Sequence, residues 1–99
     1  MGDGVLVLCE EDCCTFHIEG DLMYDKVEDF HRALNATGGI KKFEIDFSKV
    51  TKFDSSGAGL LLLLRNHVDK DSSISIINTS KEMKKRLLLL NLQEYFNIT

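Results

Sequence analysis

The stretch KKFEIDFSKVTKFDSSGAGLLLLL, residues 41–64, decides the fold because a strand pattern, a turn and a helix start follow one another directly. In its first part, phenylalanine and isoleucine alternate with polar residues, which is the period of a strand with one buried face. The Asp-Ser-Ser-Gly segment then leads into five leucines. No further Gly or Pro follows Gly59 in this segment, so a helix is expected over about 56–69.

Three further segments have the patterns of strands. Residues 14–19 alternate cleanly between apolar and polar side chains, and residues 73–77 alternate less cleanly. Residues 5–9 are apolar on both faces, which favours a strand that is covered on both sides. Residues 10–13 would join the first two strands as a hairpin.

Two more helices are expected from the spacing of apolar residues. Residues 22–36 place their apolar side chains on one side of a helix that stops at Gly38-Gly39. Ser80 is expected to cap a helix that ends near Asn91.

This order of elements predicts an α/β fold. Strands separated by helices run parallel to each other. A sheet covered on both faces would have strands that are apolar throughout, yet residues 14–19 and 43–48 each carry a polar side. We therefore expect a two-layer sandwich, with a mixed sheet of four to five strands and helices packed on one face.

Length and composition indicate one domain over residues 1–99. Hydrophobic residues make up 43% of the chain and charged residues 28%, as in ordinary globular domains. The net charge is -4, and the only dense cationic cluster lies at residues 81–86, so nucleic acid is not expected as a partner.

Cysteine usage and hydropathy indicate a cytoplasmic protein. Cys9, Cys13 and Cys14 are odd in number and make a poor disulfide framework, so we expect reduced thiols and no metal site. The chain opens with no signal-peptide pattern. Its longest apolar run, residues 60–64, is far shorter than the roughly 20 residues that span a bilayer, so no membrane insertion is expected.

Three motifs in order resemble the STAS domain family, which includes the anti-sigma factor antagonists. They are FEIDFSKV at residues 43–50, DSSGAG at residues 54–59 and TSKEMKKRLLLLNL at residues 79–92. The resemblance covers nearly the whole chain. It implies a mixed sheet with helices on one face, in agreement with the alternation pattern.

The resemblance also implies a function in bacterial signalling and transcription regulation. In phosphorylatable members, the serine directly after the aspartate accepts a phosphate from a partner serine kinase, and by position that serine is Ser55. The kinase is also the anti-sigma factor. The unphosphorylated antagonist binds it and frees the sigma factor, and a phosphatase restores binding after phosphorylation. The chain would thus be a phosphoprotein that acts by partner switching.

A partner-binding surface is expected around this serine. Ser56 is expected to be the helix cap, and Gly57 and Gly59 would keep the surface low enough for a large partner to approach. The full set of expected partner-binding residues is Asp21, Met23, Asp54, Ser55, Ser56, Gly57 and Gly59.

One position departs from the family pattern and supports an alternative. Members commonly carry an aspartate near the phosphoserine, after a Gly-x-Leu or Gly-x-Phe segment, and this chain has Met23 there. The alternative is an unmodified STAS subunit of a lipid-transporting ABC system or another regulatory complex. No nucleophile elbow or Walker lysine is present, so neither catalysis nor a cofactor is expected. The expected oligomeric state is a monomer or a weak dimer.

Overall fold

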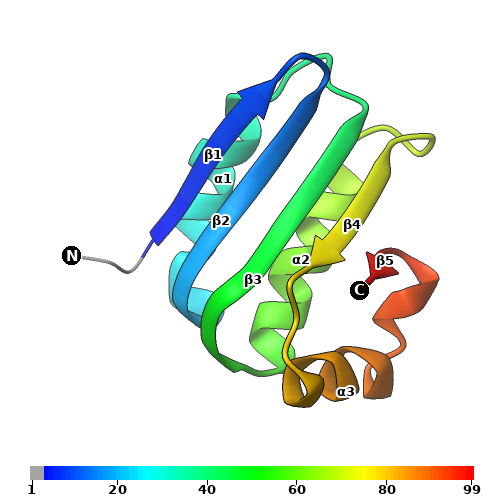
Figure 1. The fold of residues 1–99 in the computed structure, drawn as a ribbon. Helices are drawn as coiled ribbons and strands as arrows, with labels where there is room; N and C mark the ends of the chain where they lie inside the picture. The colour runs from blue at the N-terminus through cyan, green and yellow to red at the C-terminus, as the bar shows by residue number, and fades with distance from the viewer. Residues whose placement is uncertain (1–3) are drawn as a thin grey trace.

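The computed structural model describes residues 4–99, which form a five-stranded sheet with helices on one face (Figure 1). The α/β two-layer architecture expected from the alternation is confirmed. The elements in chain order are β1 (Gly4–Glu10), β2 (Cys13–Leu22), the 3-10 turn η1 (Tyr24–Lys26), α1 (Val27–Asn35), β3 (Lys42–Phe53), α2 (Ser55–His67), β4 (Ser73–Ile77), α3 (Lys81–Leu89), the 3-10 turn η2 (Leu92–Glu94) and β5 (Asn97–Ile98).

The sheet is mixed, and its strand order follows the sequence from β1 to β5. β1 pairs antiparallel with β2, as the hairpin pattern predicts, and all the other neighbouring strands are parallel. After the turn η2, the C-terminal segment adds β5 to the far edge of the sheet.

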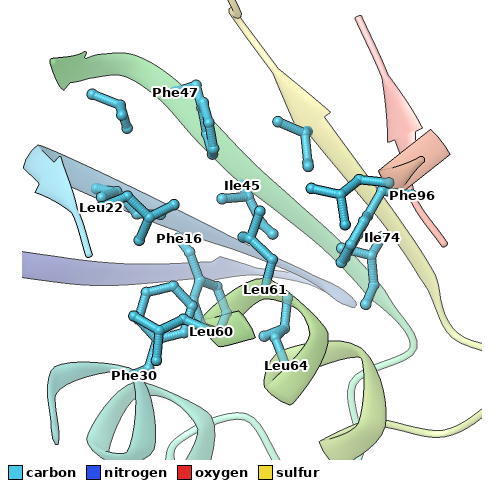
Figure 2. Packing of buried hydrophobic residues seen from close by; sticks show 14 of the residues in the cluster. Phe16, Leu22, Phe30, Ile45, Phe47, Leu60, Leu61, Leu64, Ile74 and Phe96 are labelled. Atoms are coloured by element: carbon cyan, nitrogen blue, oxygen red, sulfur yellow. The ribbon is translucent and has the colours of Figure 1, made fainter. Parts of the chain in front are cut away.

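The core lies between the sheet and the helices α1 and α2. Side chains from β2 and β3 meet side chains from both helices there, as Figure 2 shows for Phe16, Ile45, Phe30 and Leu61. Across β2 and β3, the opposite face of the sheet is polar. On it, the Thr15 hydroxyl donates to Glu44, and His17 lies 3.1 Å from Asp46, so cross-strand polar pairs cover this face instead of a second helical layer.

The expectation for β1 is wrong in one respect. Residues 5–9 were expected to be covered on both sides, but β1 is an edge strand whose Leu6 and Leu8 are 58% and 55% exposed. Val5 and Val7 pack against the core on the helix side. The apolar pattern on the other face therefore does not reflect burial.

The expectation of three reduced cysteines is also wrong. Cys9 and Cys14 are direct partners across the β1–β2 ladder, and their sulfurs form a disulfide. Cys13 keeps a free thiol. Burial, followed by the nearby charge of Glu44, raises the pKa of this thiol.

No helix found in residues 4–99 is both long enough and apolar enough to cross a bilayer.

Candidate functional site at the start of α2

The sequence motif around Ser55 lies where the parallel strands end. β2, β3 and β4 run in the same direction, and each is followed at the same end of the sheet by a helical segment, respectively η1, α2 and α3 (Figure 1). In α/β sheets, binding sites gather at this end because the loops after the strands converge there. The topology thus brings three distant segments of the chain to one surface.

Asp54 is the N-cap of α2. Its Oδ1 accepts hydrogen bonds from the backbone N–H of Ser56 at 3.0 Å, the N–H of Gly57 at 3.1 Å and the Ser56 hydroxyl at 2.6 Å. The hydroxyl bond, followed by the Gly57 bond, lowers the pKa of Asp54. The expectation that Ser56 is the cap is therefore wrong, because the aspartate two residues earlier satisfies the free N–H groups of the first turn.

Ser56 connects α2 to the start of η1, the turn that follows β2. While its hydroxyl donates to Asp54, its Oγ also accepts a hydrogen bond from the backbone N–H of Tyr24, at 3.0 Å. The hydroxyl is therefore engaged on both sides. Tyr24 itself is 68% exposed and forms one rim of the site. Tyr24 was not predicted as a site residue, because its only signal in the sequence is a large aromatic side chain shortly after a strand.

The Ser55 hydroxyl is free of the contacts that hold the Ser56 hydroxyl. It is the first residue of α2, it is exposed, and within residues 4–99 its hydroxyl has no hydrogen-bond partner. Of the two adjacent serines, Ser55 alone presents an unengaged hydroxyl to an approaching partner.

The two glycines of the motif have different surroundings. Gly57 is buried, and a Cβ added there would lie 2.1 Å from the Leu22 carbonyl oxygen. Gly57 therefore lets the start of α2 pack directly on the end of β2, and it does not contribute open surface. A Cβ at Gly59 would meet nothing within 4 Å, and this residue is exposed, as expected for a low surface near Ser55.

Asp21 and Met23 lie on the η1 side of the site. The Asp21 carboxylate accepts a hydrogen bond from the Thr51 hydroxyl at 3.0 Å, so it ties β2 to β3. The backbone carbonyl of Asp21 accepts a hydrogen bond from Lys26, which is only 4% exposed. Met23 is half-buried and directly precedes η1. These contacts fix the loop that holds Tyr24 against Ser56.

Arg86 of α3 lies on the side of the site away from η1. Its guanidinium donates to the carbonyl of Phe53 at 3.3 Å and pairs with Glu82 at 3.1 Å. Phe53 is two residues before Ser55, so this contact ties α3 to the end of β3, just before the serine. Sequence reasoning missed Arg86, since a residue in the basic cluster at 81–86 gives no local sign of this contact.

Loss of the cap should lower stability in a pH-dependent way. Asp54→Ala is expected to lower the melting temperature at neutral pH, because the N–H groups of Ser56 and Gly57 lose their acceptor. The folded-state pKa of Asp54 is below its ordinary value of 3.8, so the ionised cap contributes fully above that value. The contribution is lost as the pH falls through the lowered pKa.

Thermal unfolding of both proteins between neutral and strongly acidic pH checks this expectation. The difference in melting temperature should shrink as the pH drops below 3.8. Asp54→Asn is the matched control, because asparagine caps helices well without a charge. A constant difference at all pH values would contradict the role given to the Asp54 carboxylate.

No group of three or more His, Cys, Asp or Glu side chains that could hold a metal ion was found within residues 4–99.

Comparisons with known proteins agree with the fold. The family model described as "Mlab, STAS domain" matches residues 7–98. A "STAS-domain containing protein" of Pseudomonas aeruginosa (strain UCBPP-PA14) is 32% identical over 87 residues, which cover 86% of each chain.

Two solved structures are similar in fold at low sequence identity. An anti-sigma factor antagonist from Mycobacterium paratuberculosis has a TM-score of 0.81 and 17% identity, and the match covers 95% of this chain and 82% of that one. The Bacillus cell fate determinant SpoIIAA in its phosphorylated form has a TM-score of 0.71 and 18% identity, with 97% and 91% covered. On the family model and the Pseudomonas relative together, the chain belongs to the STAS domain family.

Proposed function

We propose that this protein is an anti-sigma factor antagonist that binds a serine kinase and is switched off when that kinase phosphorylates Ser55. The observation that carries the proposal is the contrast between the two serines. Ser55 is exposed with an unengaged hydroxyl, whereas the Ser56 hydroxyl is held by Asp54 and Tyr24. The similar Mycobacterium structure is described as an anti-sigma factor antagonist, and the similar SpoIIAA structure is described as phosphorylated.

A phosphate on Ser55 would be compatible with the folded domain. Ser55 is the first residue of a 13-residue helix, where the positive end of the helix dipole favours a negative charge. The Arg86 guanidinium, bound to the neighbouring Phe53 carbonyl, is a cation on the same surface. Phosphorylation would therefore leave the fold intact and change the charge of the surface that meets the partner.

The switch would act by charge and hydration at the interface. A phosphate adds about -1.5 to -2 charges at neutral pH. Binding a partner over Ser55 would require removal of water from that charge, and acidic groups on the partner would be repelled. A phosphatase would restore binding by removing the phosphate. We assign no catalytic step to the chain itself, since kinase and phosphatase chemistry would both belong to the partners.

Affinity capture from lysate of the native cells tests the proposal. Wild type, Ser55→Asp and Ser73→Asp are used in parallel, and the retained proteins are identified by mass spectrometry. Ser73 is exposed and begins β4, at the end of the sheet opposite Ser55 (Figure 1), so the control adds the same charge away from the site. Wild type and Ser73→Asp should retain a serine kinase that Ser55→Asp loses. Equal retention by all three proteins would contradict the switch.

A second candidate function is a fixed subunit of a lipid-transporting ABC system. Two observations favour it: the matching family model is described as "Mlab, STAS domain", and Met23 stands where phosphorylatable members carry an aspartate. The same surface would then bind a transporter ATPase whether or not Ser55 carries a charge. In the capture experiment, this function predicts that wild type and Ser55→Asp both retain that ATPase.

A further inference from the structure

The outer edge of β1 is an open hydrogen-bonding edge. β1 is first in the strand order, and within residues 4–99 it pairs only with β2. Its seven residues therefore present backbone N–H and C=O groups along the side away from β2. An edge of this kind is a template on which another strand can pair.

β1 lacks the features that normally protect an edge. Its sequence, GVLVLCE, contains no Pro and no Lys, and its register with β2 is unbroken from Gly4 to Glu10. Leu6 and Leu8 are more than half exposed on the open face of the sheet. The opposite edge of the sheet is different, since β5 has only two residues. One copy of the chain thus offers a single long edge.

We propose that the protein forms a homodimer in which β1 pairs antiparallel with β1 of a second copy, with the two-fold axis at Val7. The proposal uses neither Ser55 nor its partner and is independent of the proposed function. Since each copy has one long open edge, pairing closes after two copies and gives a ten-stranded sheet.

Side-chain parity excludes every register in which the faces of the two copies do not match. Directly opposite residues of an antiparallel pair point to the same face. An axis at Val7 sets Leu6 opposite Leu8 of the second copy, so exposed apolar residues meet on the open face, and the helices of both copies stay on the other face. A shift of one residue would put Leu6 opposite Val7 and reverse the faces of one copy.

The same axis also pairs the greatest length of strand. With the axis at Val7, all seven residues of β1 are paired, and Gly4 lies opposite Glu10, the only charged residue of the strand. No like charges then face each other directly. Moving the axis to Val5 or Cys9 would leave part of β1 without a partner within the described chain. The Val7 register therefore satisfies the most backbone groups without charge repulsion.

Sedimentation and light scattering over a concentration series test the dimer. Leu6→Lys and Leu8→Lys place a charge in the proposed interface at positions that are exposed in the single chain. Leu89→Lys is the matched control, since Leu89 lies on α3 and is 73% exposed. All variants carry Cys13→Ser, because Cys13 is the one free thiol in residues 4–99 and could link two copies by a disulfide.

The expected result is a mass twice the 11.2 kDa of the chain for the Cys13→Ser parent and for the Leu89→Lys control at high concentration. Leu6→Lys and Leu8→Lys should stay at the single-chain mass under the same conditions. Added salt should favour the dimer, since each copy carries a net charge of -4. The proposal would be overturned if the Cys13→Ser protein stayed monomeric at every concentration. It would also be overturned if Leu6→Lys and Leu8→Lys dimerised as well as the Cys13→Ser protein.

Hydrogen exchange gives a second readout that needs no substitution at the edge. As the concentration of the Cys13→Ser protein rises, exchange should slow at alternate backbone amides of residues 4–10, because the N–H groups that face the open edge gain partners while the others already bond to β2. Amides of α3 should not change. Slower exchange in α3 with unchanged exchange in β1 would show that the copies associate through a different surface and would refute the β1 dimer.

Discussion

Phe16→Ala is expected to lower the free energy of unfolding by about 4 kcal/mol, within the range for removal of a buried phenylalanine ring. Phe16 is fully buried at the centre of β2 (Figure 2). Its ring centroid lies 6.4 Å from that of Phe30 on α1 and 6.3 Å from that of Phe43 on β3. Removal of the ring would leave a cavity between the sheet and the helices. Urea unfolding followed by circular dichroism measures the loss.

An exposed aromatic residue provides the control for this substitution. Tyr24 is 68% exposed, and only its backbone N–H bonds to Ser56. Tyr24→Ala should therefore change the free energy of unfolding by less than about 0.5 kcal/mol. If Phe16→Ala were as mild as Tyr24→Ala, the packing of β2 against α1 described above would be wrong.

Gly57→Ala is expected to destabilise the domain by about 3 kcal/mol, the upper part of the usual range for overpacking. The new methyl group would lie 2.1 Å from the Leu22 carbonyl oxygen and 3.1 Å from the Phe53 ring. The nearest atom belongs to the backbone, so no side-chain rotation can relieve the contact. The end of β2 and the start of α2 would have to separate. Thermal and urea unfolding measure the effect.

Gly59→Ala is the matched control because it makes the same chemical change two residues later in α2. A Cβ at Gly59 meets nothing within 4 Å, and alanine has a higher helix propensity than glycine. The substitution should raise the free energy of unfolding by up to about 1 kcal/mol. Equal effects at the two glycines would contradict the close approach of α2 to Leu22.

The leucine run shows why the helix layer could be predicted from sequence. Five successive leucines point all round a helix, so some must face the core wherever the helix lies. In the structure Leu60, Leu61 and Leu64 are buried, while Leu62 and Leu63 are only half-buried. The alternation in β3 was equally informative, since it placed Phe43, Ile45 and Phe47 in the core and left the other face polar. Local periodicity determines which residues face inward.

The position of β1 could not be predicted in this way. A strand that is apolar on both faces fits the middle of a covered sheet, yet β1 lies at the edge with Leu6 and Leu8 exposed. Strand order depends on contacts between distant segments, which periodicity does not report. The Cys9–Cys14 disulfide was missed for a related reason, because the pairing follows from the hairpin register with Glu10 opposite Cys13.

The sequence predicted which motif forms the site, but it did not predict which distant residues contact that motif. The motif around Ser55 was found because its residues are consecutive. Tyr24 and Arg86 were not found, because they reach the start of α2 from segments about thirty residues away. The assignment of the cap to Ser56 was wrong because Asp54 and Ser56 are both good capping residues, and only the backbone geometry distinguishes them.

Phosphorylation of Ser55 defines the proposed switch, and site-resolved mass spectrometry detects it on the protein itself. Wild type and Ser55→Ala are incubated in lysate of the native cells with ATP and phosphatase inhibitors, re-purified and digested. The predicted result is a single added phosphate on Ser55 of wild type and none on the variant. A phosphate on Ser56, a phosphate retained by Ser55→Ala, or an unmodified wild-type protein would contradict a switch by phosphorylation of Ser55.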